Sequence, residues 1–359
     1  MPHLHIFNPE NDFALALGRR AYTPDKGARA IRRAGCLLPL WWAEPGDAVL
    51  IDSADSELLA QAERLKESFG LHGHIVSRPP EGFIPDPWGW SHHLRRQLIC
   101  DGVDPRLLPS DDYLDRLRML SHRRTAVAVN RLIGTPEALM PAEVDSPEEA
   151  LAVIDNHHRG NAVVKLPWSS SGRGVIYAGA IPRPTLETYI RGMIRRQGSL
   201  TIEPLYDRVR DFAMLFEATE AGVEYRGLST FQTDERGFYA GNIAAPQLHI
   251  ASLIGADTTP LIAPLREALA RVIAPIGYRG WIGVDMLTHR SPSATSPIAI
   301  APCIEINFRR TMGVAALHAA PRLNLSNFTP SFRQILAKWR LSYSNFAFKF
   351  QNLLKAILS

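Results

Sequence analysis

The chain has 359 residues, 46% of them apolar and 21% charged, as is usual for a folded protein of two or three domains. Its formal charge of +4 comes without a long basic block or a basic–aromatic repeat, so the sequence gives no indication of nucleic-acid binding. Three scattered cysteines are too few for a disulfide framework, and there is neither a secretory signal nor an apolar run of the ~20 residues that span a membrane, so we expect a cytoplasmic protein with no membrane partner.

The first 118 residues alternate short apolar runs with helical patterns. We expect strands at 4–7, 48–52 and 74–77, and helices at 24–34 and 56–69. Strands that alternate with helices favour a parallel sheet covered by helices. This segment is therefore predicted to be an α/β domain with a mainly parallel sheet.

A segment rich in proline and tryptophan follows at 79–91. We interpret it as a loop, because proline cannot donate a hydrogen bond to a neighbouring strand. Packing against the neighbouring domain is the favoured role for this loop, and contact with a substrate is the alternative.

From residue 119 onward the pattern changes to strand-rich segments with fewer helices. Helices are expected at 125–133, 146–154, 185–196 and 260–273. Strands are expected at 162–165, 175–178, 200–205, 211–218, 224–232, 237–241, 281–288 and 298–308. Apolar residues at helical spacing in the tail, 339–358, favour a terminal helix packed on the body over a membrane-surface helix.

One lysine stands out between two apolar runs. Only six of the 40 lysine and arginine residues are lysines, and Lys165 is followed by a loop of small residues that includes Ser169, Gly172 and Gly174. Backbone N–H groups in such a loop can approach phosphate oxygens, because glycine has no Cβ to hold a ligand away. Lysine adds a compact positive charge. The alternative is a lysine at the end of a buried strand with its ammonium in water.

A second polar cluster lies on the last two predicted strands. Alternate residues of a strand share one face, so Glu305, Asn307 and Arg309 point the same way, and Asp285 joins them if the two strands pair. Two carboxylates and an amide oxygen suit Mg²⁺ or Mn²⁺, with nucleotide phosphates as the remaining ligands. An exposed strand face with unrelated polar residues is the alternative.

The order of these motifs resembles the ATP-grasp superfamily over about residues 119–315. The motifs are the small-residue loop, a strand ending in Glu203-Pro204, the Gly-Val-Asp285 segment and Glu305-x-Asn307. The resemblance implies a two-subdomain ATP-grasp fold, with a small subdomain at 119–204 and a large one at 205–330. The α/β domain at 1–118 would precede it, and a helical tail at 331–359 would follow.

The resemblance also implies roles for individual residues. Lys165 and Arg309 would be catalytic, and Asp285, Glu305 and Asn307 would bind the metal. The ATP-binding residues would be Arg124, Lys165, Ser169, Ser170, Ser171, Gly172, Gly174, Glu203 and Asp211. Many relatives have a second lysine where this chain reads Arg123-Arg124, and the sequence leaves open which of the two arginines contacts ATP. Asn8, Asp12 and Arg310 are expected to contact the substrate, with a turn or helix cap as the alternative for the first two.

The implied activity is that of an Mg²⁺-dependent ligase that uses ATP. ATP would phosphorylate a carboxylate, and an amine or similar nucleophile would displace phosphate from the acyl phosphate. Small-molecule acids and nucleophiles are therefore the expected partners, and a homodimer is one open arrangement. A regulatory or scaffolding ATP-binding module, or a kinase that stops at phosphoryl transfer, are the alternatives.

Overall fold

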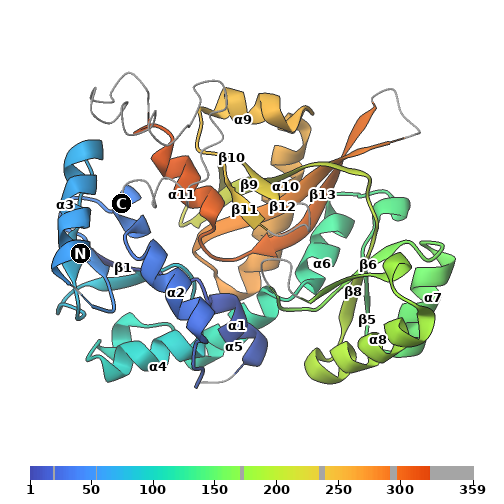
Figure 1. Cartoon of the computed structure of the whole chain (residues 1–359), viewed down its shortest axis with the longest axis horizontal. Helices are drawn as coiled ribbons and strands as arrows, with labels where there is room; N and C mark the ends of the chain where they lie inside the picture. The colour runs from blue at the N-terminus through green and yellow to red at the C-terminus, as the bar shows by residue number, and fades with distance from the viewer. Residues whose placement is uncertain (19–20, 54, 170–173, 234–238, 292–296, 324–359) are drawn as a thin grey trace.

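The computed structural model describes residues 1–18, 21–53, 55–169, 174–233, 239–291 and 297–323. Three sheets lie side by side, with the N-terminal sheet at the left, the largest sheet in the centre and a small sheet at the right (Figure 1). Each sheet takes its strands from one of the predicted segments 1–118, 119–204 and 205–330, although the domain limits themselves stay a prediction. The predicted tail lies outside the described residues.

The N-terminal sheet is parallel throughout, as the sequence predicts. Its strands are β1 (His3–Ile6), β2 (Ala48–Leu50), β3 (His74–Val76) and β4 (Ile84–Pro87), in the order β3-β2-β1-β4. The helices of this part are α1 (Asn11–Leu17), α2 (Lys26–Gly35), α3 (Ser56–Phe69), α4 (His92–Cys100) and α5 (Asp111–Leu120). Asp25 and Asp55 cap the first turns of α2 and α3 through their carboxylates, which fixes where these helices begin.

The prediction of a loop over 79–91 is wrong, because strand β4 lies within it. β4 tolerates Pro85 and Pro87 because it is at the edge of the sheet. The backbone N–H groups of Ile84 and Trp88 point toward β1 and donate to Pro2 O and Ile6 O. The N–H groups that bond to β1 therefore belong to alternate residues of this segment. The prolines occupy the positions between these, whose N–H groups would point away from the sheet.

The small sheet is antiparallel and is covered by two helices. Its strands are β5 (Ala142–Val144), β6 (Ala162–Lys165), β7 (Val175–Tyr177) and β8 (Leu200–Pro204), in the order β5-β8-β6-β7. α7 (Pro147–Asn156) and α8 (Arg183–Gln197) pack on it, with Ile154 and Ile190 buried in its core. Ser146 caps the predicted helix that begins there, because Glu149 N donates to Ser146 Oγ at 3.2 Å.

The large sheet holds the last five described strands. They are β9 (Arg208–Thr219), β10 (Gly222–Thr233), β11 (Tyr239–Asn242), β12 (Gly280–Arg290) and β13 (Ile298–Asn307), in the order β11-β10-β9-β12-β13. α6 (Arg124–Leu132), α9 (Gln247–Ile254) and α10 (Thr259–Ile273) contribute to its core, in which Phe212 and Phe216 are fully buried. β12 and β13 correspond to the predicted strands 281–288 and 298–308, and they pair antiparallel, which is the condition for Asp285 to join Glu305.

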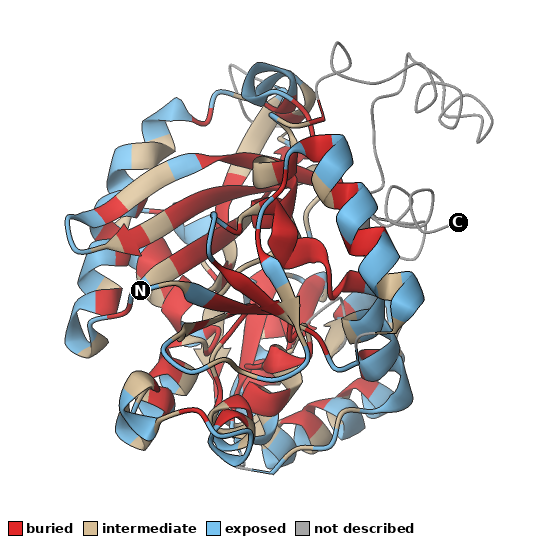
Figure 2. Cartoon of the chain, turned by 90° about the vertical axis from the view of Figure 1, so that its left-hand side faces the viewer, coloured by how far each residue is buried: buried red, intermediate tan, exposed pale blue. Residues whose placement is uncertain are grey.

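The chain returns from the large sheet to the N-terminal sheet through α11 (Met312–Ala319). Ala315 and Ala319 on this helix are fully buried among core residues of the N-terminal part. In the opposite direction, Leu114 and Leu117 of α5 pack into the core of the large sheet. The two sheets therefore share apolar packing, and Figure 2 shows buried residues running continuously through the interior while the exposed ones lie on the outer faces.

Short 3₁₀ turns complete the described chain. They are η1 (Leu38–Trp41), η2 (Pro105–Leu107), η3 (Glu137–Leu139), η4 (Ala178–Ala180) and η5 (Ala274–Ile276). Within the described ranges, no single helix has the length and apolar character needed to cross a membrane. One pair, Gln247–Ile254 and Thr259–Ile276, meets that test together across a 100° bend.

A buried ion pair fastens the end of β13 to β4. Arg310 donates to both carboxylate oxygens of Asp86, at 2.6 and 2.7 Å, and its backbone N donates to Trp88 O at 2.8 Å. Asp86 also lies 2.9 Å from His5 Nδ1 on the neighbouring strand. Although burial alone would raise it, Arg310 and His5 hold the pKa of Asp86 well below its usual range.

We expect Asp86→Asn to lower the free energy of unfolding at pH 7 by roughly 2–3 kcal/mol, because Arg310 loses its charged acceptor. Since the folded-state pKa is depressed, this contribution is present above the unfolded pKa of about 4 and is lost as pH falls below it. The difference between variant and wild type in urea unfolding should therefore shrink in acid. Asp112→Asn, which breaks an exposed pair with Arg116, is the control and should change little. An equal effect of both substitutions would contradict the assignment.

Candidate active site

The predicted lysine lies in the small sheet and makes a buried ion pair. Lys165 Nζ on β6 donates to Glu203 Oε2 on β8 at 2.5 Å, and the two side chains are only 11% and 6% exposed. The strands are antiparallel, with Val163 opposite Glu203, so the two side chains reach each other diagonally. The structure thus brings together two residues that the sequence had assigned separately to the ATP site.

The residues on either side of the small-residue loop are held together by the pairing of β6 with β7. Lys165 pairs with Val175 on β7, and Leu166 N donates to Gly174 O at 3.0 Å. Gly174 has a φ of +69°, and a Cβ there would lie 2.7 Å from Leu166 Cδ1, so this position requires glycine. Ser170, Ser171 and Gly172 lie outside the described residues.

Arg123, rather than Arg124, reaches into the site. Arg123 is buried and donates through Nε to Leu166 O at 2.9 Å and through Nη2 to Ser169 Oγ at 3.1 Å. Its Nη1 lies 3.0 Å from Glu305 Oε2 on β13. Arg123 therefore ties the loop of the small sheet to an acidic residue of the large sheet.

Arg124, which the sequence analysis included among the ATP-binding residues, points elsewhere. Its side chain pairs with Glu143 at 2.9 Å and is about half exposed. Its backbone N donates to Nδ1 of the buried His122, whose pKa falls to about 3 through burial and three nearby arginines, so this imidazole stays neutral and can accept. The difference arises because Arg124 is the first residue of α6 and Arg123 precedes it, which turns the two side chains in different directions.

The predicted metal-binding residues meet on the large sheet. Asp285 on β12 is directly opposite Glu305 on β13, and Gly283 is opposite Asn307. Asn307 Nδ2 donates to Asp285 Oδ2 at 3.1 Å. Burial, followed by the charge of Glu305, raises the pKa of Asp285 to about 7. The two carboxylates thus repel each other in a place that favours a cation.

Asp285 differs from the other acids of the site in its partners. Glu203 pairs with Lys165 and Glu305 with Arg123, whereas Asp285 forms no ion pair with any residue the structure describes. Nor do three Asp, Glu, His or Cys side chains within the described ranges form a group that would hold a metal alone. Two carboxylates and an amide oxygen fit Mg²⁺ when phosphate and water oxygens supply the other ligands.

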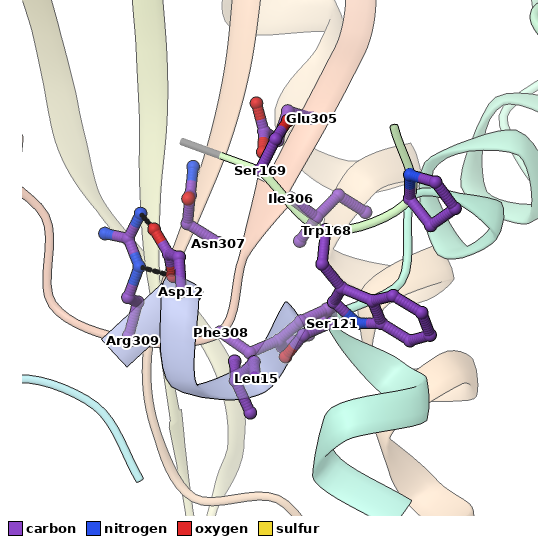
Figure 3. Close-up of a pocket in the computed structure, with 11 residues that line it drawn as sticks. Asp12, Leu15, Ser121, Trp168, Ser169, Glu305, Ile306, Asn307, Phe308 and Arg309 are labelled. Carbon is purple, nitrogen blue, oxygen red and sulfur yellow. Dashed lines mark hydrogen bonds and ion pairs between the residues drawn. The ribbon is translucent and has the colours of Figure 1, made fainter. Parts of the chain in front are cut away.

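A pocket opens beside this acidic pair, where all three parts of the chain meet. Arg309 donates to both oxygens of Asp12, at 2.7 and 2.6 Å, and the two side chains form one wall (Figure 3). Glu305 and Asn307 line the pocket as well, together with Ser169 from the small-sheet loop. Asp12, predicted to contact substrate, and Arg309, predicted to be catalytic, are therefore side by side.

Some lining residues have no motif that sequence reasoning would select. Trp168 is one, and its Nε1 donates to Arg118 O at 2.9 Å while its ring packs against His122 and Arg118. Leu15 and Ser121 also line the pocket. The only feature of the sequence that could have pointed to Trp168 is its position directly before the small-residue loop.

Two of the three proposed substrate contacts are occupied in structural bonds. Asn8 is buried, and its side chain donates to Gly89 O at 2.8 Å and accepts from Gly89 N at 3.3 Å, which fixes the turn after β1. Arg310 is held by Asp86, as described above. These bonds agree with the turn weighed as the alternative for Asn8, and substrate contact by Asn8 or Arg310 stays a prediction.

Asp211 lies near the lysine pair at the start of β9. Its carboxylate accepts from Arg208 at 3.2 Å. Burial raises its pKa above the usual range, against the lowering effects of Arg208 and Lys165. A buried acid close to Lys165 is compatible with the ribose contact that the resemblance implies.

We expect Lys165→Met to destabilise the protein by about 3–5 kcal/mol, because it leaves Glu203 as an uncompensated buried charge. The double variant Lys165→Met/Glu203→Gln should recover most of this loss. Urea unfolding measures both effects, and Lys66→Met, which removes a more exposed pair with Glu63, should cost under about 1 kcal/mol. Failure of the second substitution to restore stability would show that the pair is not the source of the effect.

Of the comparisons with known proteins, only the one with solved structures finds matches. No family model matches the chain, and no curated protein sequence matches it. A structure of N5-carboxyaminoimidazole synthase from Aspergillus clavatus aligns with 70% of this chain and 66% of its own, at 15% identity and a TM-score of 0.40. This chain thus spans about two thirds of that protein.

Two further structures align at similar levels. Biotin carboxylase from Campylobacter jejuni aligns over 76% of this chain and 70% of its own, at 13% identity and a TM-score of 0.46. D-alanyl-alanine synthetase A from Vibrio cholerae aligns over 81% and 96%, at 12% identity and a TM-score of 0.44.

Proposed function

We propose that the chain is an ATP-dependent ligase that activates a carboxylate and couples it to an amine or similar nucleophile. The observation that supports this most directly is that a basic residue of the small sheet and acidic residues of the large sheet are linked through one arginine. The small sheet presents Lys165, and the large sheet presents Asp285 and Glu305. Arg123 joins the two.

In this proposal, Lys165, Arg123, Ser169 and Gly174 bind the phosphates of ATP. Arg123 takes the place first given to Arg124, because its guanidinium contacts both the loop and Glu305. Glu203 and Asp211 lie toward the nucleoside. Asp285, Glu305 and Asn307 would hold Mg²⁺, which when bound neutralises phosphate charge.

The reaction then proceeds by two displacements. A carboxylate oxygen of the substrate attacks the γ-phosphorus, the bond to the β-phosphate oxygen breaks, and ADP leaves. The nucleophile attacks the acyl carbon, phosphate leaves with the electron pair, and the amine loses a proton. Arg309, held in place by Asp12, is positioned to balance the negative charge of the transferring group. Burial of this pair restricts the water that would hydrolyse an acyl phosphate.

We expect Glu305→Gln to remove the strengthening effect of Mg²⁺ on ATP binding. Isothermal titration with ATP, with and without Mg²⁺, measures this without knowledge of the substrates. Glu224→Gln on β10, where Glu224 pairs with Arg226, is the matched control and should behave as wild type. Circular dichroism would show that the fold of both variants is intact. A Mg²⁺ effect unchanged in Glu305→Gln would refute the metal assignment.

We expect hydroxylamine to trap the activated intermediate. With ATP, Mg²⁺ and a panel of carboxylic acids, an acyl phosphate yields a hydroxamate together with ADP. A kinase acting on a hydroxyl would release ADP and give a stable phosphate ester without hydroxamate, and a binding module would release no ADP. Lys165→Met/Glu203→Gln is the control for contaminating activity. Either of the last two results with wild type would overturn the ligase proposal.

A further inference from the structure

A second cavity, of about 190 Å³, lies in the N-terminal part of the chain. It is formed where parallel strands end. Ile6 and Phe7 are at the carboxyl end of β1, and Leu50 and Ile51 are at the carboxyl end of β2. Leu98 on α4, the helix that follows β4, closes another side.

The strand order makes this position favourable for a ligand. The chain runs from β1 outward to β2 and β3, and then crosses back to place β4 on the other side of β1. The strand order therefore reverses between β1 and β4, and open α/β sheets bind ligands at the carboxyl ends of the strands at such a point. The cavity is bordered by the segments that follow β1, β2 and β4.

One wall of the cavity is strongly basic. Arg29, Arg32 and Arg33 are three and four positions apart on α2, so they share one side of that helix, and all three line the cavity. Asp52 is the single acid among the described lining residues, and its side chain is 66% exposed. Among the described lining residues, three arginines therefore face one carboxylate.

The three arginines differ in how far they are already neutralised. Arg32 pairs with the buried Glu10 and also lies 3.5 Å from the carboxylate of Asp52, and Arg33 pairs with the exposed Asp55 at 3.0 Å. Arg29 makes no ion pair with any residue in the described ranges. The pKa of the nearby His93 is lowered by burial and, to a smaller extent, by the positive charges of Arg32 and Arg96.

Apart from Asp52, Ser53 and Gln97, the rest of the lining is apolar. Phe7, Leu94 and Leu98 are buried core residues, and the thiol of Cys36 has its pKa raised to about 11 by burial and the nearby Asp52. Such a surface suits a ligand with an apolar skeleton, because that ligand would remove the apolar side chains from contact with water.

We propose that this cavity binds a small organic anion, with its phosphate or carboxylate group at Arg29 and Arg32 and its apolar part against Phe7 and Leu98. Arginine recognises both groups through paired N–H donors. The site is separate from the pocket beside Glu305, and the proposal does not rest on the proposed function. The segment after β1 borders both, since Phe7 lines the cavity and Asp12 lines the pocket.

Phenyl phosphate and benzoate are suitable probes, and isothermal titration at low salt would measure their binding. Excess ADP and Mg²⁺ would be present to occupy the nucleotide site. We expect saturable one-to-one binding of at least one probe, and the tighter one identifies the group that the cavity prefers. Arg29→Glu should weaken this binding tenfold or more, whereas Arg29→Lys should weaken it less.

Arg29 is the residue to change because it is exposed and its replacement uncovers no buried acid, whereas loss of Arg32 would leave Glu10 unpaired. Arg266→Glu on α10 is the matched control, since it makes the same charge reversal on an exposed helix position and should leave binding unchanged. Equal affinity of Arg29→Glu and wild type, or no saturable binding of either probe, would overturn the proposal. The Mg²⁺ effect on ATP binding is an independent readout of the other site.

Discussion

Two consecutive arginines that follow β13 hold together the parts of the chain around the candidate active site. Arg309 is bonded to Asp12 through both carboxylate oxygens, and Arg310 is bonded to Asp86 in the same way. Both acids belong to the N-terminal part of the chain. Because a paired, planar fork fixes orientation as well as distance, these two contacts hold the large sheet against the parallel sheet in one arrangement. The pocket lies where this arrangement meets the small sheet.

Charges within the site are also compensated by residues from different segments of the chain. Lys165 neutralises Glu203 and Arg123 neutralises Glu305, so most buried charges have a partner from another strand or loop. Asp285 has the Asn307 amide as a donor but no cationic partner among the described residues. The carboxylate of Asp285 thus lacks a full charge partner next to a pocket lined by Glu305, Asn307 and Arg309, and this distinguishes the region from an ordinary buried ion-pair network.

Much of the fold follows from local patterns, whereas the site depends on contacts between distant residues. The apolar alternation around Asp285 and Glu305 predicted two strands, and the short connection between them made antiparallel pairing the simplest arrangement. β4 was missed because Pro85 and Pro87 argue against a strand unless its edge position is known. Likewise, no sequence pattern separates Arg123 from Arg124, since their roles depend on where α6 begins and on Ser169, 46 positions from Arg123.

The two prolines of β4 also limit how copies of this chain can assemble. An exposed strand edge invites a strand from another molecule to add to the sheet, because its N–H and C=O groups lack partners. On the outer side of β4 the donor positions fall at Pro85 and Pro87, which have no N–H group to offer. That border of the parallel sheet therefore offers few N–H donors to an added strand, which disfavours strand addition there.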